Sequence, residues 1–180
     1  MMVDQINQPE RVRISPSSGT RLAVIGLGYV GLPLAAAAAG AGIAVTGIDV
    51  DPDKVEALNQ GRSYIPNVSD QALGRALEAD GLRATTDYAA LREVDAAFIC
   101  VPTPFKEMRT PDPQHIVAAS GAIARNLKPG HLIVLQSTTY PGTTEEVVLP
   151  FLEQSGLKAG LDLNLAFSAE RIDPGQTSSQ

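Results

Sequence analysis

Three glycines near the start of the chain have the clearest chemistry. Gly26, Gly28 and Gly31 stand in the spacing G-x-G-x-x-G, between an apolar run and an alanine-rich stretch. Where such glycines join a strand to a helix, the first makes a tight turn, the second lets the backbone approach a pyrophosphate, and the third allows close helix–strand packing. The helix N-terminus also offers free N–H groups and a partial positive charge to phosphates. The residues predicted to bind a dinucleotide here are Gly26, Leu27, Gly28, Tyr29, Val30 and Gly31.

An acidic residue follows where a dinucleotide fold needs one. Asp49 ends the second apolar run, roughly 20 residues beyond Gly26. A carboxylate there binds the adenosine ribose hydroxyls and repels a 2′-phosphate, so the pattern favours NAD over NADP, although the nearby Lys54 weakens that preference. The alternative is that the glycines only form a tight turn and Asp49 only caps the next helix. Agreement of strand, spacing, helix and acid favours the cofactor site.

Polar segments follow three later apolar runs. They are VPTP at 101–104, STTYPGTT at 137–144 and SAERIDPG at 168–175. Ligands of an open parallel sheet bind beyond the carboxyl ends of its strands, so all three segments are expected on the cofactor's side. They would bring hydroxyls from Ser137, Thr138 and Thr139 and the acid Glu170. Hydroxyls and prolines also populate ordinary loops, but three such segments in register favour a site.

The remaining reactive side chains predict no second site. Cys100 falls inside a buried strand and is expected to be a small core residue rather than a nucleophile. His115 is expected on a helix and His131 at the start of a strand. Neither has an acidic residue at the spacing of a catalytic pair, so both are expected to be structural or surface residues. No metal-ligand cluster is expected.

Apolar runs alternating with helical patterns must position these residues. The five expected strands, apolar on both faces as parallel strands are, span Arg21–Gly26, Ile43–Asp49, Asp95–Val101, His131–Ser137 and Leu163–Ser168. The expected helices lie within Tyr29–Gly42, Asp51–Gly61, Ser69–Gly81, Asp112–Gly130 and Thr143–Gly156. This pattern predicts an α/β fold, a Rossmann-type doubly wound parallel sheet in three layers, α/β/α.

Local signals mark several helix ends. Asp51, before a first-turn proline, and Ser69 are expected N-caps. Thr143 and Glu146 have the spacing of a capping box, and Pro150 is expected to kink or shorten the helix that follows.

Length and composition limit the class of protein. A chain of 180 residues with 44% hydrophobic residues is long enough for one well-buried domain. The net charge of −6 argues against nucleic-acid binding. The N-terminus has no apolar signal region, no run is long enough for a bilayer, and one cysteine suits a reducing compartment, so a cytoplasmic protein without membrane contact is expected. The expected organisation is a flexible leader at 1–20, an NAD-binding Rossmann domain at 21–173 and a frayed tail at 174–180.

Taken together and in order, the motifs resemble one family. From RLAVIGLGYVGLPLA through CVPTP and STTYPGTTEEVVLP to ERIDPG, the chain resembles the N-terminal half of the UDP-glucose/GDP-mannose dehydrogenase family, the nucleotide-sugar 6-dehydrogenases. The variants GRSYIPNVSD, STTYPGTTEE and ERIDPG look most like the branch acting on UDP-N-acetylhexosamines, the UDP-N-acetylglucosamine 6-dehydrogenases.

The resemblance implies an activity and residue roles. Such enzymes oxidise the C6 hydroxyl of a UDP-sugar to a carboxylate with two NAD, through a cysteine thiohemiacetal and thioester, and supply precursors of polysaccharides. Carried over, the glycine turn binds the pyrophosphate, Asp49 the ribose, and Lys54 lies beside the adenosine half. Thr138 helps to orient a catalytic water, and Glu170 assists thioester hydrolysis as a general base. The residues implied to line the nicotinamide side are Val101, Pro102, Thr103, Ser137, Thr138 and Thr139, and those implied to border the nucleotide-sugar are Glu170, Arg171 and Ile172.

The chain also departs from the family pattern. Family members are more than twice as long, and the cysteine nucleophile, a catalytic lysine and most of the UDP-sugar pocket belong to the second half; Cys100 does not match that nucleophile. Ala169 stands where many relatives have proline. The chain is therefore expected to be a fragment or a truncated product, inactive alone, of an enzyme whose full-length form is a homo-oligomer. The alternatives are a non-catalytic NAD-binding module and the cofactor domain of a hydroxyacid-type dehydrogenase, which explains GLGYVG but not STTYPGTT with ERIDPG.

Overall fold

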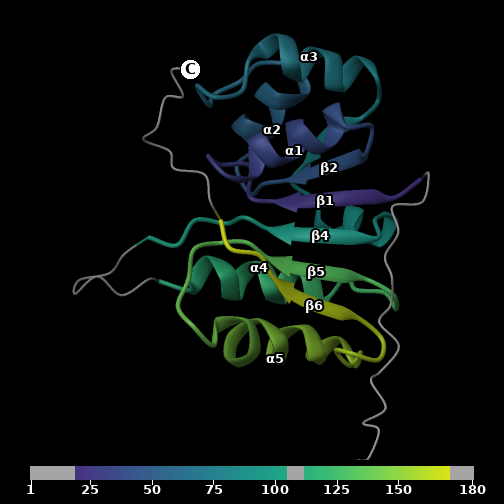
Figure 1. Ribbon diagram of the computed structural model, residues 1–180, viewed down its shortest axis with the longest axis vertical. Coiled ribbons are helices and arrows are strands. Elements are labelled where there is room, and N and C mark those ends of the chain that lie inside the picture. The colour runs from purple at the N-terminus through teal and green to yellow at the C-terminus, as the bar shows by residue number, and fades with distance from the viewer. Residues whose placement is uncertain (1–18, 105–111, 171–180) are drawn as a thin grey trace, which may run out of the picture.

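A parallel sheet of six strands forms the centre of the molecule. The computed structural model describes residues 19–104 and 112–170. The strands run in the order β3-β2-β1-β4-β5-β6 (Figure 1). Their bounds are β1 Arg21–Ile25, β2 Ala44–Ile48, β3 Leu82–Thr85, β4 Ala96–Ile99, β5 Leu132–Leu135 and β6 Asn164–Phe167. The chain builds outward from β1 to β3 and then returns to build β4 to β6 on the other side, so the predicted doubly wound fold is confirmed.

This strand order creates a switch point between β1 and β4. The loops after these two strands leave in opposite directions, which opens a crevice at their carboxyl ends. Ile25 at the end of β1 pairs with Ile48 of β2 and Ile99 of β4, so the three strands end at the same level. The loops that follow them therefore share one edge of the sheet.

Helices cover the two faces of the sheet and enclose two separate cores. The helices are α1 Gly31–Gly40, α2 Pro52–Asn59, α3 Asp70–Glu78, α4 Gln114–Ala124 and α5 Leu149–Leu152, with 3₁₀ turns at Tyr88–Glu93 and Glu153–Ser155 and a π-helical turn at Thr144–Val148. Along β1, Val24 belongs to the core beneath α1 and α3, whereas Ile25 belongs to the core beneath α4. Neighbouring strand residues point to opposite faces, so these two cores lie on opposite sides of the sheet.

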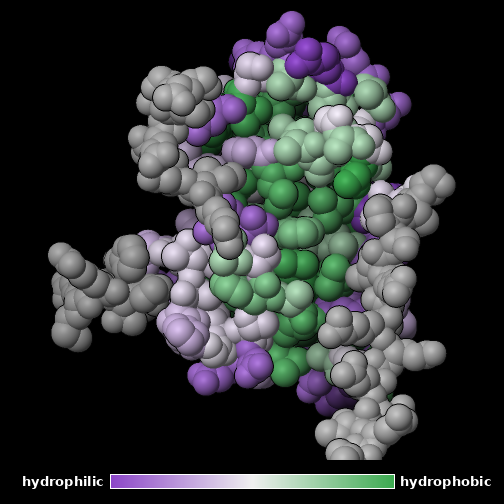
Figure 2. All heavy atoms as spheres, viewed as in Figure 1, coloured by the Kyte–Doolittle hydropathy of each residue, from purple (hydrophilic) through white to green (hydrophobic). Residues whose placement is uncertain are grey.

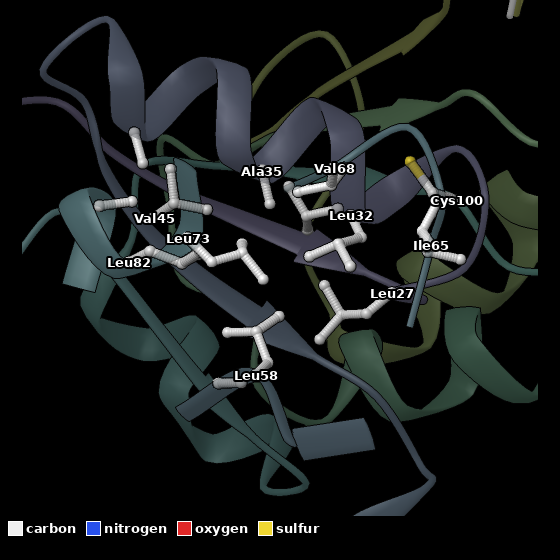
Figure 3. Close-up of a cluster of buried hydrophobic side chains, with 14 of the residues drawn as sticks. Leu27, Leu32, Ala35, Val45, Leu58, Ile65, Val68, Leu73, Leu82 and Cys100 are labelled. Carbon is white, nitrogen blue, oxygen red and sulfur yellow. The ribbon is translucent and has the colours of Figure 1, made fainter. Parts of the chain in front are cut away.

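Aliphatic side chains fill both cores. In the first, Leu32 of α1, Leu58 of α2 and Leu73 of α3 are completely buried around Leu27 (Figure 3). Each such side chain contributes about 1.5–3 kcal/mol by leaving water. Figure 2 shows the resulting distribution, with apolar side chains over the sheet and polar ones over the outer helix α3.

Two expected helix caps are confirmed and one is wrong. The Asp51 side chain accepts from the N–H of Asp53, and the Ser69 side chain accepts from that of Ala72. Thr143 does not cap its helix, because its backbone is already helical and its hydroxyl donates to the Tyr140 carbonyl at 2.8 Å.

The segment that contains Pro150 is irregular, as expected. Proline lacks the N–H that a regular α-helix uses at every interior position. The chain runs here as a π-helical turn, one short α-helical turn and a 3₁₀ turn in succession.

One strand was not predicted. β3 reads LRAT and alternates buried and exposed residues, whereas the prediction sought runs that are apolar on both faces. Arg83 lies on the polar side of this edge strand, where its guanidinium bonds Thr46 at 3.1 Å and Glu93 at 2.7 Å.

Some expectations cannot be compared with the structure. Residues 1–18 and 171–180, which hold most of the leader and the whole tail, lie outside the described residues, as do Arg171 and Ile172. In the described part of the chain, every helix is too short or too polar to cross a membrane. Within 19–104 and 112–170, no three His, Cys, Asp or Glu side chains gather as a metal ion would require.

Candidate dinucleotide-binding site

A cavity of about 800 Å³ lies beyond the carboxyl ends of β1, β2, β4 and β5. Its lining includes every predicted cofactor residue except Leu27, Gly31 and Thr139, whose hydroxyl bonds that of Thr143 instead. Leu27 is missing because its side chain is buried in the core below, and Gly31 because it is buried at the start of α1. The structure therefore brings the glycine turn, the acid and the two polar loops together at the switch point.

The glycine turn is closely packed at both ends and open in the middle. Gly26 has φ of +89°, and a Cβ there would lie 2.8 Å from the carbonyl oxygen of Cys100. A Cβ on Gly31 would overlap the Gly26 carbonyl. In contrast, no protein atom lies within 4 Å of the Cβ position of Gly28, which faces the cavity. Packing thus requires glycine at 26 and 31, whereas position 28 leaves the backbone accessible to a ligand.

Asp49 joins the second strand to the glycine turn. Its side chain is only 7% exposed and accepts from the N–H of Leu27 at 2.7 Å and of Asp51 at 3.0 Å. The ammonium group of Lys54 lies 3.9 Å from the same carboxylate. An ionised carboxylate has about four acceptor positions, so it can bind ribose hydroxyls while it holds both backbone groups. Holding the turn is a role that the sequence did not predict.

The loops after β4 and β5 are tied together beside the cavity. The Ser137 hydroxyl lies 2.7 Å from the Val101 carbonyl and 3.2 Å from that of Ile99. Thr103 donates its hydroxyl to the Thr138 carbonyl at 2.6 Å. These bonds fix the two loops relative to each other, so they face the cavity as one rigid wall.

Glu170 lies beside the cavity rather than in its lining. The carboxamide of Gln136, just after β5, donates to Glu170 at 2.8 Å. Burial, together with the nearby charge of Glu170, raises the pKa of the Cys100 thiol to about 12. Cys100 is 6% exposed, which confirms that it is a core residue, and its thiol stays protonated at neutral pH.

The structure adds cavity residues that the sequence analysis did not assign to the site. Tyr64, Tyr88 and His115 line the cavity, and the small residues of α4 that form a wall with His115 are Ala118, Ala119 and Ala122. Only their positions in the fold reveal these residues, since none stands in a motif with a cofactor role.

His131 has the structural role that was expected. It is 2% exposed, its Nδ1 accepts from the N–H of Lys128 at 3.3 Å, and its Nε2 lies 3.0 Å from the Val94 carbonyl. Burial lowers the pKa of the His131 ring, so the neutral form is favoured.

Comparison with known families identifies this arrangement. Residues 20–180 match the family model described as the UDP-glucose/GDP-mannose dehydrogenase family, NAD binding domain. The chain belongs to this family. Its glycine turn, acid and loop pair are therefore those of an NAD-binding domain of the UDP-glucose/GDP-mannose dehydrogenase family.

Individual relatives agree with this assignment. The chain is 41% identical over 172 residues to the UDP-N-acetyl-D-mannosamine dehydrogenase of Salmonella typhi, covering 88% of this chain and 39% of that protein. It is 38% identical over 156 residues to the UDP-N-acetyl-D-glucosamine 6-dehydrogenase of Pseudomonas aeruginosa, covering 86% and 36%. Among solved structures, a ternary complex of GDP-mannose dehydrogenase from Pseudomonas aeruginosa matches with a TM-score of 0.81 and 34% identity, covering 86% of this chain and 37% of that one. The chain thus spans about two fifths of the length of the curated relatives that it matches.

Proposed function

We propose that this chain supplies the NAD-binding half of a nucleotide-sugar 6-dehydrogenase whose substrate is a UDP-N-acetylhexosamine. The observation that carries the proposal is the meeting of the glycine turn, Asp49 and the two tied loops around one cavity at the switch point. Relatives named as dehydrogenases of UDP-N-acetylmannosamine and UDP-N-acetylglucosamine support the substrate class.

The residues present fit NAD. Gly28 leaves room for a pyrophosphate to approach the backbone, at the N-terminus of α1. Asp49 would bind the adenosine ribose and, as an anion, would disfavour the extra phosphate of NADP; its position at the end of β2, beside the glycine turn, supports this role. The wall formed by the loops after β4 and β5 would face the nicotinamide half. When bound there, NAD accepts hydride from the carbon that is oxidised.

Two further side chains would act on the substrate. Glu170, held by Gln136, is proposed as the general base that activates water for thioester hydrolysis, and Thr138 is proposed to orient that water. The C6 hydroxyl would first be oxidised to an aldehyde, a cysteine thiol would add to it to give a thiohemiacetal, and a second oxidation would give the thioester. Each oxidation passes one hydride to NAD and releases one proton, and water then displaces the cysteine sulfur to give the carboxylate. The cysteine that carries the thioester would come from polypeptide outside these 180 residues, because the Cys100 thiol is buried and has a pKa of about 12.

A substrate screen tests this proposal. The polypeptide that carries these residues in its source cells would be purified and assayed for NADH formation with UDP-N-acetylglucosamine, UDP-N-acetylmannosamine, UDP-N-acetylgalactosamine and UDP-glucose. We expect two NADH per sugar oxidised and the highest kcat/KM with an N-acetylated substrate. NAD binding without reduction by any UDP-sugar would contradict the proposal and favour the non-catalytic NAD-binding module.

The hydroxyacid-type alternative has no comparable support. A glycerol-3-phosphate dehydrogenase from Coxiella burnetii matches with a TM-score of 0.59 but only 19% identity, which shows the shared fold alone.

A further inference from the structure

The loop between α2 and α3 folds back against the glycine turn. This segment, residues 62–69, is called the 62–69 loop. The hydroxyl of Ser63 bonds the N–H of Ile65 at 3.1 Å, and the N–H of Ser63 donates to Asp70 of α3 at 2.7 Å. Ile65 and Val68 are 4% and 6% exposed and belong to the same core as Leu27 (Figure 3). The loop is therefore anchored at α3 and in the core, and its conformation is fixed next to the turn.

One side chain of this loop reaches the glycine turn itself. The hydroxyl of Tyr64 donates to the carbonyl of Leu27 at 2.9 Å, and the ring lines the cavity. The N–H of Leu27 is held in turn by Asp49 at 2.7 Å. Two successive peptide groups of the turn, the one before Leu27 and the one after it, are thus each held by a different side chain.

The hydrogen bond from Tyr64 to the Leu27 carbonyl determines where the N–H of Gly28 points. In a trans peptide, the carbonyl of one residue and the N–H of the next point in opposite directions. Because the Leu27 carbonyl is turned to Tyr64, the N–H of Gly28 is turned away from it. That N–H has no hydrogen-bond partner among the residues that the structure describes. Its direction is therefore fixed by Tyr64 rather than by a bond of its own.

We propose that Tyr64 is a positioning residue for NAD, which holds the Leu27–Gly28 peptide in the orientation that the bound pyrophosphate requires. The inference rests on the predicted placement of the pyrophosphate at the glycine turn. A turn that is held before binding loses less conformational freedom when the ligand arrives, so this bond acts on affinity. It gives the 62–69 loop a function besides packing.

The chemistry of the phenol suits this role. Burial raises the pKa of Tyr64, and the carboxylates of Asp49 and Asp51 raise it further. The hydroxyl therefore remains a protonated donor throughout the physiological pH range.

The test uses Tyr64→Phe, which removes the hydroxyl and keeps the ring. Calorimetric titration of the whole chain should show the Kd for NAD raised about threefold to tenfold, as expected for one lost hydrogen bond. Without NAD, hydrogen exchange should accelerate at the amide of Leu27, whose N–H is bonded to Asp49 in the held turn, whereas the amides of Ile65 and Val68 should keep their wild-type rates. Ser155→Ala is the control, because it too removes a hydroxyl that donates to a backbone carbonyl, that of Leu152 at 2.6 Å, and Ser155 does not line the cavity; it should leave both quantities unchanged.

The outcomes separate this inference from the proposed function. If the wild-type chain binds NAD and Tyr64→Phe binds it within twofold as tightly, the positioning role is wrong and the cofactor site stands. If exchange accelerates across the whole 62–69 loop while the Kd is unchanged, Tyr64 has only a structural role. If the wild-type chain itself fails to bind NAD, the cofactor site of the proposed function fails.

Discussion

Asp49 should be needed both for the stability of the glycine turn and for the choice of cofactor. Its carboxylate accepts two backbone N–H groups, one of them the buried N–H of Leu27. A hydrogen bond to a charged group contributes about 1.5–3 kcal/mol, so Asp49→Ala should lower the free energy of unfolding by about 3 kcal/mol or more. Asp49→Asn keeps one acceptor oxygen but turns an amide N–H toward a backbone donor, so a smaller loss of about 2 kcal/mol is expected.

Asp49→Asn should also relax the selection against NADP. Two unit charges 4 Å apart interact by about 4 kcal/mol at an effective dielectric constant of 20. Removing the charge of Asp49 should therefore lower the Kd for NADP relative to the Kd for NAD by more than about tenfold. Asp53→Asn is the control, because Asp53 is an exposed aspartate in the first turn of α2 and its loss changes the net charge equally.

Two assays on Asp49→Asn and Asp53→Asn test these two roles of Asp49. Urea denaturation at pH 7 measures the free energy of unfolding, and calorimetry with NAD and NADP measures the two Kd values. Equal stability of the two variants would refute the role of Asp49 in the turn. An unchanged NADP-to-NAD ratio in Asp49→Asn would refute its placement at the ribose.

Further predictions follow from other residues of the site and core. Gly31→Ala should lower the free energy of unfolding in urea by about 2 kcal/mol or more, because its Cβ would meet the Gly26 carbonyl. Gly28→Ala should keep wild-type stability and weaken NAD binding. Equal stability of the two variants would count against this packing. The pKa of His131 is lowered in the folded chain, so as the pH falls the unfolded chain binds the proton first. The free energy of unfolding should therefore fall as the pH drops below about 6.5, and it should fall less in His131→Gln. Denaturation between pH 7.5 and 5 measures both. In the complete enzyme, Glu170→Gln should let a covalent substrate adduct accumulate in the intact protein mass, and rapid turnover by this variant would remove Glu170 from the mechanism. The 180-residue chain alone should bind NAD weakly and oxidise no UDP-sugar, and robust NADH production by it would contradict the proposal.

Local patterns were sufficient to predict the strands of the switch point. The apolar runs before Gly26 and within Asp95–Val101 form β1 and β4, central strands that must be apolar on both faces because helices cover both sides. β3 lies at the sheet edge, where one side of the strand carries polar side chains such as Arg83, whose guanidinium bonds Thr46. A search for apolar runs therefore finds the centre of such a sheet and misses its polar edge.

Contacts between distant residues could not be predicted. Tyr64 meets Leu27 across 37 positions of sequence, and Gln136 meets Glu170 across 34. These pairings depend on how the elements dock, which no local pattern contains.

The proposed function requires NAD to bind in the cavity beyond the carboxyl ends of β1, β2, β4 and β5. The most direct measurement is a titration of the ¹⁵N-labelled chain with NAD, followed by amide chemical shifts. We predict saturable shifts that are largest at 26–31 and 49–51 and in the loops after β4 and β5. A titration that leaves these amides unmoved, or shifts mainly those around Arg21, Thr46 and Arg83 near the amino ends of β1, β2 and β3, would contradict NAD binding in this cavity.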